Sequence, residues 1–212
     1  MSQRKLNSSE ADTWDRLANR YDQSVKLFDR SYSRVRELLR RDLSGLGHVL
    51  EVASGTGQFT FALAEVVTQL TATDISKEMV ERLRVKLVEQ QVDNVATEVR
   101  SAYELGVGDG LLDGICCANA LHVMETPQRA LAEFHRALKP EGRLVIPTFC
   151  HGIDRRRRLL SWFVGLVTPF VAHTRFTPAS LEEMVVGNGF RVVEITTLPG
   201  KFPLAYILAN RE

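Results

Sequence analysis

The sequence predicts an α/β domain built on a mostly parallel sheet, and three observations favour that class. Of the 212 residues, 44% are hydrophobic, which is enough to bury one substantial core. From residue 48 onward, apolar runs of strand length alternate with amphipathic stretches, which is the pattern of βαβ units. We find no internal repeat, low-complexity tract or Gly/Ser-rich linker, so we expect a single domain over residues 1–212.

Seven apolar runs have the length and composition of strands. They fill the sequence from residue 48 to residue 209, with room for helices between them. The predicted strands are His48–Ala53, Leu70–Asp74, Val95–Arg100, Asp113–Asn119, Arg143–Phe149, Phe190–Thr197 and Leu204–Ala209.

Capping residues indicate three helix starts. Ser76 is a suitable N-cap for a helix whose apolar residues recur at helical spacing. Thr126 and Thr177 each precede a proline, the residue best suited to the first helical position. Gly187 or Gly189 can end the last of these helices ahead of the sixth strand.

Two segments depart from the regular alternation around a core of residues 46–150. Residues 1–45 are charged and helical in pattern, and we expect them to form helices that cover the core. Residues 151–176 are an insertion after the fifth strand, and residues 177–212 supply the last helix and strands. The apolar run within Asp154–His173 is too short for a membrane span, so we expect a lid or a membrane-surface element.

Charge and cysteine content narrow the functional class. Lys and Arg number 27 against 26 Asp and Glu, and a net charge of +1 gives no long-range attraction for nucleic acid. The sequence starts without an apolar leader, and its three cysteines suggest no disulfide framework, which together predict a cytoplasmic protein. Cys116 and Cys117 lie in an apolar run, so we expect core residues and no metal site. A monomer or a homodimer is expected.

A glycine-containing loop follows the first predicted strand. Residues 49–59 run from apolar residues through Ser54, Gly55 and Gly57 into a helix. Glycines in such a turn let a ligand approach the backbone, and the helix N-terminus offers free N–H groups. The loop alone also fits dinucleotide-binding proteins. Glu51 argues against them, because its carboxylate would repel a pyrophosphate.

A second acid ends the next predicted strand. Asp74 follows Glu51 by 23 positions and stands at a strand's carboxyl end. This is the place of an acid that accepts hydrogen bonds from ribose hydroxyls. Ser76 already fits the role of helix cap, so capping does not explain Asp74.

The segment from Glu51 to Gly57 resembles motif I of the class I S-adenosylmethionine-dependent methyltransferases, a loop of the form E/D-x-G-x-G-x-G. The resemblance implies that the acid and the loop backbone hold the methionine end of S-adenosylmethionine. It also implies a Rossmann-like, seven-stranded, mostly parallel sheet with helices on both faces and an antiparallel last strand. Ala53 replaces the first glycine of the motif, which is acceptable if its φ angle is negative.

Two further segments extend this resemblance to nearly the whole chain. Residues 112–123, with Lys139–Gly142 after them, are similar to the "type 11" group that includes ubiquinone/menaquinone-biosynthesis methyltransferases. Residues 14–22 resemble that group's opening segment, which implies that Tyr21 lies over the cofactor. Ser101 stands where the family often has an aspartate for the adenine amino group, so backbone amides and apolar contacts are expected to contribute more.

The loop, the two acids and the resemblance together give the residues expected to bind S-adenosylmethionine. They are Tyr21, Glu51, Ala53, Ser54, Gly55, Gly57, Phe59, Asp74, Ile75, Met79, Ser101, Ala102, Tyr103, Asn119 and Ala120. The residues expected to contact an acceptor are His151, Trp162, Phe163 and His173.

His122 is the candidate general base, because imidazole titrates near neutral pH and His122 follows the fourth strand. The alternative is a histidine that is hydrogen-bonded within the cofactor wall. We expect methyl transfer to a small hydrophobic or aromatic acceptor. Two alternatives stay open, a lipid or quinone methyltransferase that meets the membrane surface through residues 154–173, and a non-catalytic binding module.

Overall fold

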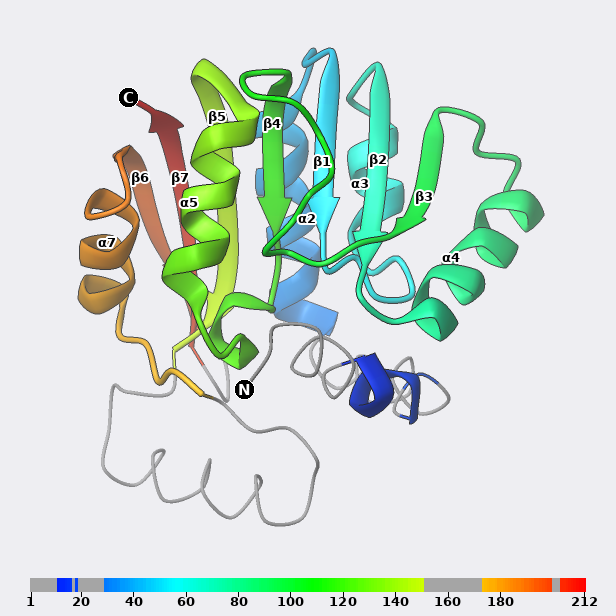
Figure 1. The fold of residues 1–212 in the computed structure, drawn as a ribbon, viewed down its shortest axis with the longest axis horizontal. Coiled ribbons are helices and arrows are strands. Elements are labelled where there is room, and N and C mark those ends of the chain that lie inside the picture. Colours follow the sequence, from blue (N-terminus) through cyan, green and yellow to red (C-terminus); the bar gives the residue numbers. More distant parts are fainter. Residues whose placement is uncertain (1–10, 17, 19–28, 151–172, 200–202) are drawn as a thin grey trace.

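The computed structural model describes residues 11–16, 18, 29–150, 173–199 and 203–212. Their strands form one seven-stranded sheet in the order β3-β2-β1-β4-β5-β7-β6 (Figure 1). The first five strands pair in parallel, and β7 runs antiparallel to both β5 and β6. This confirms the predicted mostly parallel sheet with an antiparallel last strand. The strands are β1 His48–Val52, β2 Gln69–Asp74, β3 Val95–Val99, β4 Leu112–Cys117, β5 Leu138–Phe149, β6 Phe190–Leu198 and β7 Leu204–Arg211.

Helices cover both faces of the sheet. On one face α2 (Asp29–Leu43) and α3 (Thr60–Ala64) pack on a core that includes Cys116 of β4. On the other face α5 (Pro127–Ala137) and α7 (Pro178–Val186) pack on a core that includes Cys117, because successive strand residues point to opposite faces. Both thiols are buried, as predicted for core residues, and burial raises the pKa of Cys117 to about 12.

The α4 helix (Lys77–Glu89) begins as the sequence predicts. The Ser76 hydroxyl accepts a hydrogen bond from Met79 N at 3.1 Å, which satisfies one of the free N–H groups of the first turn. The α7 helix also begins at its predicted cap, where Thr177 and Ser180 form a capping box. Thr126 precedes Pro127 at the start of α5 but makes no capping hydrogen bond through its side chain.

The fifth strand begins earlier than predicted. The sequence places its start at Arg143, whereas β5 runs from Leu138 and includes the Lys-Pro-Glu-Gly segment. Leu138 pairs with Leu112 of β4, the register then shifts, and Glu141 adopts a φ of 59°. A bulge therefore accommodates residues whose composition is typical of a turn.

The strand order reverses direction between β1 and β4. From β1 the sheet grows through β2 to β3 on one side, and through β4 to β5 on the other (Figure 1). Ligands of open α/β sheets bind at such a point, beyond the carboxyl ends of the strands. Within the described residues no helix is long and apolar enough to cross a membrane.

Candidate functional site

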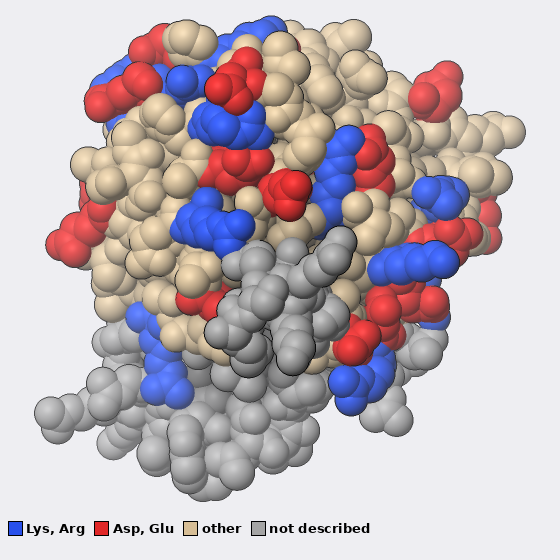
Figure 2. Space-filling model, viewed as in Figure 1, with Lys and Arg blue, Asp and Glu red and all other residues tan. Residues whose placement is uncertain are grey.

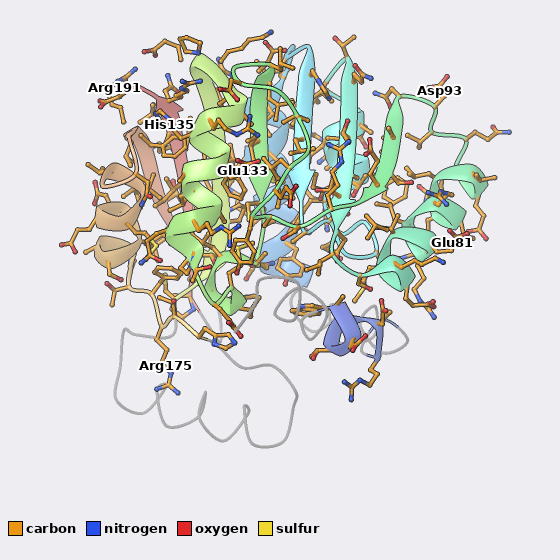
Figure 3. The ribbon with its side chains drawn as sticks, in the orientation of Figure 1. Glu81, Asp93, Glu133, His135, Arg175 and Arg191 are labelled. Carbon is orange, nitrogen blue, oxygen red and sulfur yellow. The ribbon has the colours of Figure 1, made fainter. Side chains whose placement is uncertain are left out.

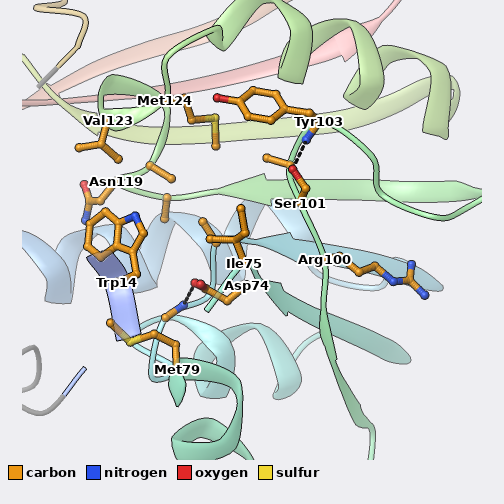
Figure 4. A pocket seen from close by; sticks show the side chains of 15 residues that line it. Trp14, Asp74, Ile75, Met79, Arg100, Ser101, Tyr103, Asn119, Val123 and Met124 are labelled. Atoms are coloured by element: carbon orange, nitrogen blue, oxygen red, sulfur yellow. Dashed lines mark hydrogen bonds between the residues drawn. The ribbon is translucent and has the colours of Figure 1, made fainter. Parts of the chain in front are cut away.

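A cavity lies at the carboxyl edge of the sheet, where the loops after β1, β2, β3 and β4 meet (Figure 4). The space between the residues that line it is about 690 Å³, open solvent included. The residues that line it are Trp14, Ala53, Gly55, Asp74, Ile75, Met79, Arg100, Ser101, Ala102, Tyr103, Ala118, Asn119, Ala120, Val123 and Met124.

Asp74 is the carboxylate of this cavity wall, and both of its oxygens are held by the backbone. Gly55 N donates to Oδ2 at 2.8 Å, and Ser76 N donates to Oδ1 at 2.9 Å. Burial raises the pKa of Asp74 to about 6, while these backbone hydrogen bonds act in the opposite direction. The side chain is therefore fixed, and its remaining lone pairs are available to hydroxyl donors of a ligand.

The loop after β1 differs from expectation at Ala53. The sequence interpretation required a negative φ there, but Ala53 adopts a φ of 55°, in the left-handed region that favours glycine. Gly55 has a φ of 56° and also lines the cavity. Gly57, at a φ of 96°, does not line it, and a Cβ there would lie 2.6 Å from Leu83 Cδ1. Gly57 thus lets the loop close against α4.

Glu51 lies behind this loop and is not among the residues that line the cavity. Its side chain is 2% exposed, and the Thr60 hydroxyl donates to Oε2 at 2.5 Å. Burial raises the pKa of Glu51 to about 8; the Thr60 hydrogen bond lowers it and the nearby charge of Asp74 raises it. The predicted contact of Glu51 with a ligand stays a prediction.

Ser54 and Phe59 also stand outside the cavity lining. Ser54 is buried, and its Oγ has no hydrogen-bond partner among the described residues. Phe59 is a core residue whose ring meets Tyr32 edge-on at 5.2 Å between centroids. The structure therefore assigns Phe59 to the core. The Ser54 Oγ in the loop after β1 is a buried polar atom that a ligand or water could satisfy.

The segment after β3 lines the cavity as predicted. Ser101 Oγ accepts a hydrogen bond from Tyr103 N at 3.3 Å, so the hydroxyl proton is left for a ligand or water. The Tyr103 ring is mostly buried, with Arg129 stacked over it at 5.5 Å. Ala102, between Ser101 and Tyr103 in the sequence, also lines the cavity.

Asn119, just beyond β4, combines two unusual features. Its φ is 54°, and its amide Nδ2 donates to the Tyr32 hydroxyl at 3.0 Å. Its Oδ1 is buried and has no hydrogen-bond partner among the described residues. Such an atom in a cavity wall is normally satisfied by a ligand or by water.

The sequence interpretation missed five residues of the lining, namely Trp14, Arg100, Ala118, Val123 and Met124. Trp14 belongs to residues 14–22, the segment that resembles the family's opening, but only Tyr21 of that segment was expected over the cofactor. Ala118, Val123 and Met124 flank the predicted Asn119, so extending that motif by a few residues in each direction would have found them.

His122 lies in the short η2 helix (Leu121–Val123) and is not a lining residue. It is buried, and its Nδ1 lies 3.0 Å from the Thr148 hydroxyl. This placement supports the hydrogen-bonded alternative, while the role of general base stays a prediction. His173 is exposed and does not line the cavity, and its contact with an acceptor also stays a prediction.

Four other predicted site residues lie outside the described residues. They are Tyr21, His151, Trp162 and Phe163. Among the described residues, no group of His, Cys, Asp and Glu could hold a metal ion. His135 on α5, labelled in Figure 3, is away from the cavity and packs edge-on against Phe190 at 5.4 Å between centroids.

Comparison with known proteins agrees with the geometry. A family model described as "Methyltransferase domain" matches residues 50–146. The ubiquinone/menaquinone biosynthesis C-methyltransferase UbiE of Syntrophotalea carbinolica is 28% identical, over 91% of this chain and 90% of that protein. The UbiE protein of Zymomonas mobilis is 28% identical over 65% of this chain, and the match spans 58% of that protein, less than two thirds of its length.

A solved structure shows the same fold. The magnesium protoporphyrin IX methyltransferase of Synechocystis PCC 6803, with bound S-adenosylhomocysteine (SAH), aligns over 98% of this chain and 96% of that chain. The TM-score is 0.72 at 20% sequence identity. The family match over residues 50–146, the UbiE relatives and the shared fold together support a class I S-adenosylmethionine-dependent methyltransferase.

The cavity suits S-adenosylmethionine in its chemistry. S-adenosylmethionine has a diol, a flat base and a charged methionine end. The fixed Asp74 carboxylate offers acceptors to a diol, and Ile75, Met79 and Tyr103 provide apolar walls for a base. The orphaned Asn119 Oδ1 offers one more acceptor on the β4 side.

Proposed function

We propose that this methyltransferase transfers the methyl group of S-adenosylmethionine to a small acceptor with an apolar or aromatic ring. One observation supports the cofactor assignment most strongly. Asp74 is buried at a strand's carboxyl end with both carboxylate oxygens fixed by backbone N–H groups, and it lines the cavity. A buried carboxylate in a cavity wall, with a pKa raised by burial, is a candidate ligand-binding group.

In this proposal the cavity lining divides by role. Asp74 accepts hydrogen bonds from the ribose hydroxyls, and Ser101 and Ala102 face the base. Ala53 and Gly55 bring the loop backbone to the methionine end. When bound, S-adenosylmethionine supplies an electrophilic methyl group on a sulfonium. The chain's own contribution is alignment and exclusion of water, since an in-line displacement from sulfur needs little else.

The acceptor is proposed from the apolar side of the cavity and from the relatives' names. Trp14, Val123 and Met124 are apolar lining residues close to Asn119 in Figure 4. Flat apolar side chains favour a ring, and the UbiE relatives are named as quinone-biosynthesis C-methyltransferases. Where the acceptor must lose a proton, His122 is the proposed base.

Charge on the visible surface is in keeping with a small-molecule acceptor. Figure 2 shows Lys and Arg side chains interspersed with Asp and Glu on the face that carries α5. An example is Arg136, which pairs with Glu133 at 2.7 Å and also with Asp109. The absence of nucleic-acid substrates and the cytoplasmic location remain predictions.

A methyl-transfer assay tests the proposal. Purified protein is incubated with methyl-labelled S-adenosylmethionine and a panel that contains dithionite-reduced 2-prenyl-1,4-naphthoquinone, simple phenols, alkylamines and bulk transfer RNA. We expect label in the apolar ring compounds. Label in the transfer RNA alone, or in none of the panel although SAH binds, would contradict the proposed acceptor class.

The membrane-surface alternative has its own test. The basic residues Arg155–Arg158 precede the apolar insertion, and both lie outside the described residues. The alternative predicts that the protein sediments with anionic liposomes, and that neutralising the four arginines to glutamine abolishes sedimentation. Protein that stays in the supernatant with anionic and neutral liposomes alike would contradict it.

A further inference from the structure

The short helical segment of residues 11–16 is joined to the start of α4 by one side chain. Asp15 Oδ1 accepts a hydrogen bond from the Ser76 hydroxyl and a second one from Glu78 N at 3.2 Å. Asp15 is partly buried by this contact, although it lies 61 positions before Ser76 in the sequence. The neighbouring residue Trp14 is part of the cavity wall (Figure 4).

Both donors are groups that need an acceptor at this place. Ser76 is fully buried, and its hydroxyl already accepts from Met79 N, so its own proton requires a partner. Glu78 N belongs to the first turn of α4, where backbone N–H groups have no partner within the helix. A carboxylate at a helix N-terminus is also favoured by the helix dipole. Asp15 thus completes the cap of α4 from a distant segment.

Ser76 links this contact to the cofactor cavity. Its backbone N–H donates to Asp74 Oδ1, while its side chain donates to Asp15 Oδ1. The carboxylate proposed to bind the ribose and the carboxylate that holds the N-terminal segment therefore share one residue. The negative charge of Asp15 also raises the pKa of Asp74, in the same direction as the larger effect of burial.

We propose that Asp15 is a positioning residue that fastens the segment carrying Trp14 to α4, so that Trp14 closes one side of the cavity over a bound cofactor. The inference rests on the proposed function for the identity of the ligand, but not for the contact itself. Because Asp15 and Trp14 are adjacent, fixing the first restricts where the second can lie. Release of a ligand then requires these two hydrogen bonds to open or the wall to move.

Stopped-flow dissociation of SAH tests this role. Asp15→Ala is expected to raise the dissociation rate constant about 10-fold or more, because it removes both charge-assisted hydrogen bonds that hold the Trp14 segment. Asp15→Asn keeps an oxygen at the same place and should recover part of the loss. Asp12→Ala is the matched control, because Asp12 is exposed on the same helical segment and should leave the rate unchanged. Ser76 still accepts from Met79 N in all three variants, so all three should fold, and Asp15→Ala should melt somewhat lower because the Ser76 hydroxyl loses its acceptor.

A measurement without ligand separates this inference from the proposed function. The chain has two tryptophans, so 5-fluorotryptophan labelling gives two ¹⁹F resonances, and Trp14→Phe assigns one of them. Asp15→Ala should shift and sharpen the Trp14 resonance, and Asp12→Ala should not. If the wild type fails to bind SAH, the proposed function is wrong, while the resonance still tests the contact. An Asp15→Ala protein with the wild-type resonance and the wild-type dissociation rate would overturn the inference.

Discussion

The Asp74 carboxylate accepts a hydrogen bond from the backbone N–H of Gly55 at 2.8 Å. This bond joins the end of β2 to the loop after β1, two features that lie 19 positions apart in the sequence. Together with the bond from Ser76 N, it means that the acid, the glycine loop and the start of α4 take their positions from one side chain. A change at Asp74 should therefore disturb the shape of the cavity as well as its chemistry.

Asp74→Asn is expected to weaken SAH binding by roughly 1.5–3 kcal/mol, the usual cost of losing a hydrogen bond to a charged group. An asparagine must turn its NH₂ group toward either Gly55 N or Ser76 N, and two donors then face each other. Calorimetric titration measures the change in dissociation constant. Asp93→Asn is the control, because Asp93 is exposed on the loop before β3 (Figure 3). Equal affinities for wild type and Asp74→Asn would refute the role.

The free energy of unfolding should fall between pH 6 and pH 8 because of Glu51. The folded-state pKa of Glu51 is raised to about 8 by burial, above the ordinary value of 4.5. The folded protein therefore binds a proton that the unfolded chain has released, and its stability is highest at low pH and falls as pH rises through 8. The slope for one proton is at most about 1.4 kcal/mol per pH unit. Asp74 acts in the same direction but below pH 6.

Glu51→Gln isolates this contribution. Glutamine keeps an acceptor for the Thr60 hydroxyl and has no proton to lose. Urea unfolding at pH 6, 7, 8 and 9 should give a flatter profile for the variant, so that its stability relative to wild type improves with pH. Parallel profiles for the two proteins over this range would show that Glu51 titrates outside it.

The left-handed backbone at Ala53 predicts an order of stability. Glycine adopts a φ of 55° without strain, whereas a β-branched residue there is strongly disfavoured. Ala53→Gly is expected to be as stable as wild type or slightly more stable, since relief of strain is partly offset by the lost methyl contact with the core. Ala53→Val should lose about 1–3 kcal/mol. A valine variant as stable as wild type in urea would contradict the strained geometry.

The strands were predictable because a parallel sheet that is buried on both faces leaves near-continuous apolar runs in the sequence. Cys116 and Cys117, for example, fill opposite faces of β4. The position of Asp74 was predictable for the same reason, since it ends such a run. Local sequence was therefore sufficient to predict the position of a residue that stands at the carboxyl end of a strand.

The remaining features depend on contacts between distant residues. The start of β5 at Leu138 is decided by its pairing with Leu112, which no local pattern reveals. Trp14 reaches the cavity through the contact of Asp15 with Ser76. The φ angle of Ala53 follows from the path of a loop that must close under Asp74. Composition and spacing therefore do not predict the start of β5, the position of Trp14 or the φ angle of Ala53.

A buried hydrogen bond away from the cavity predicts loss of stability alone. The Tyr206 hydroxyl on β7 donates to Asp42 Oδ2 on α2 at 2.7 Å, and both side chains are buried. Tyr206→Phe removes one of two donors to Asp42 Oδ2, the other being Arg41 Nη2 at 3.0 Å, and we expect it to cost about 1–3 kcal/mol in urea unfolding. Neither residue lines the cavity, so the SAH dissociation constant should not change. An unchanged stability, or a weakened affinity, would argue against this assignment.

The central claim is that the cavity at the carboxyl edge binds the methyl donor, and calorimetric titration of the wild-type protein with SAH tests it most directly. We predict saturable binding with one site per chain, weakened by Asp74→Asn and unaffected by Asp93→Asn. No heat of binding, from protein whose circular dichroism and cooperative melting show that it is folded, would contradict the claim.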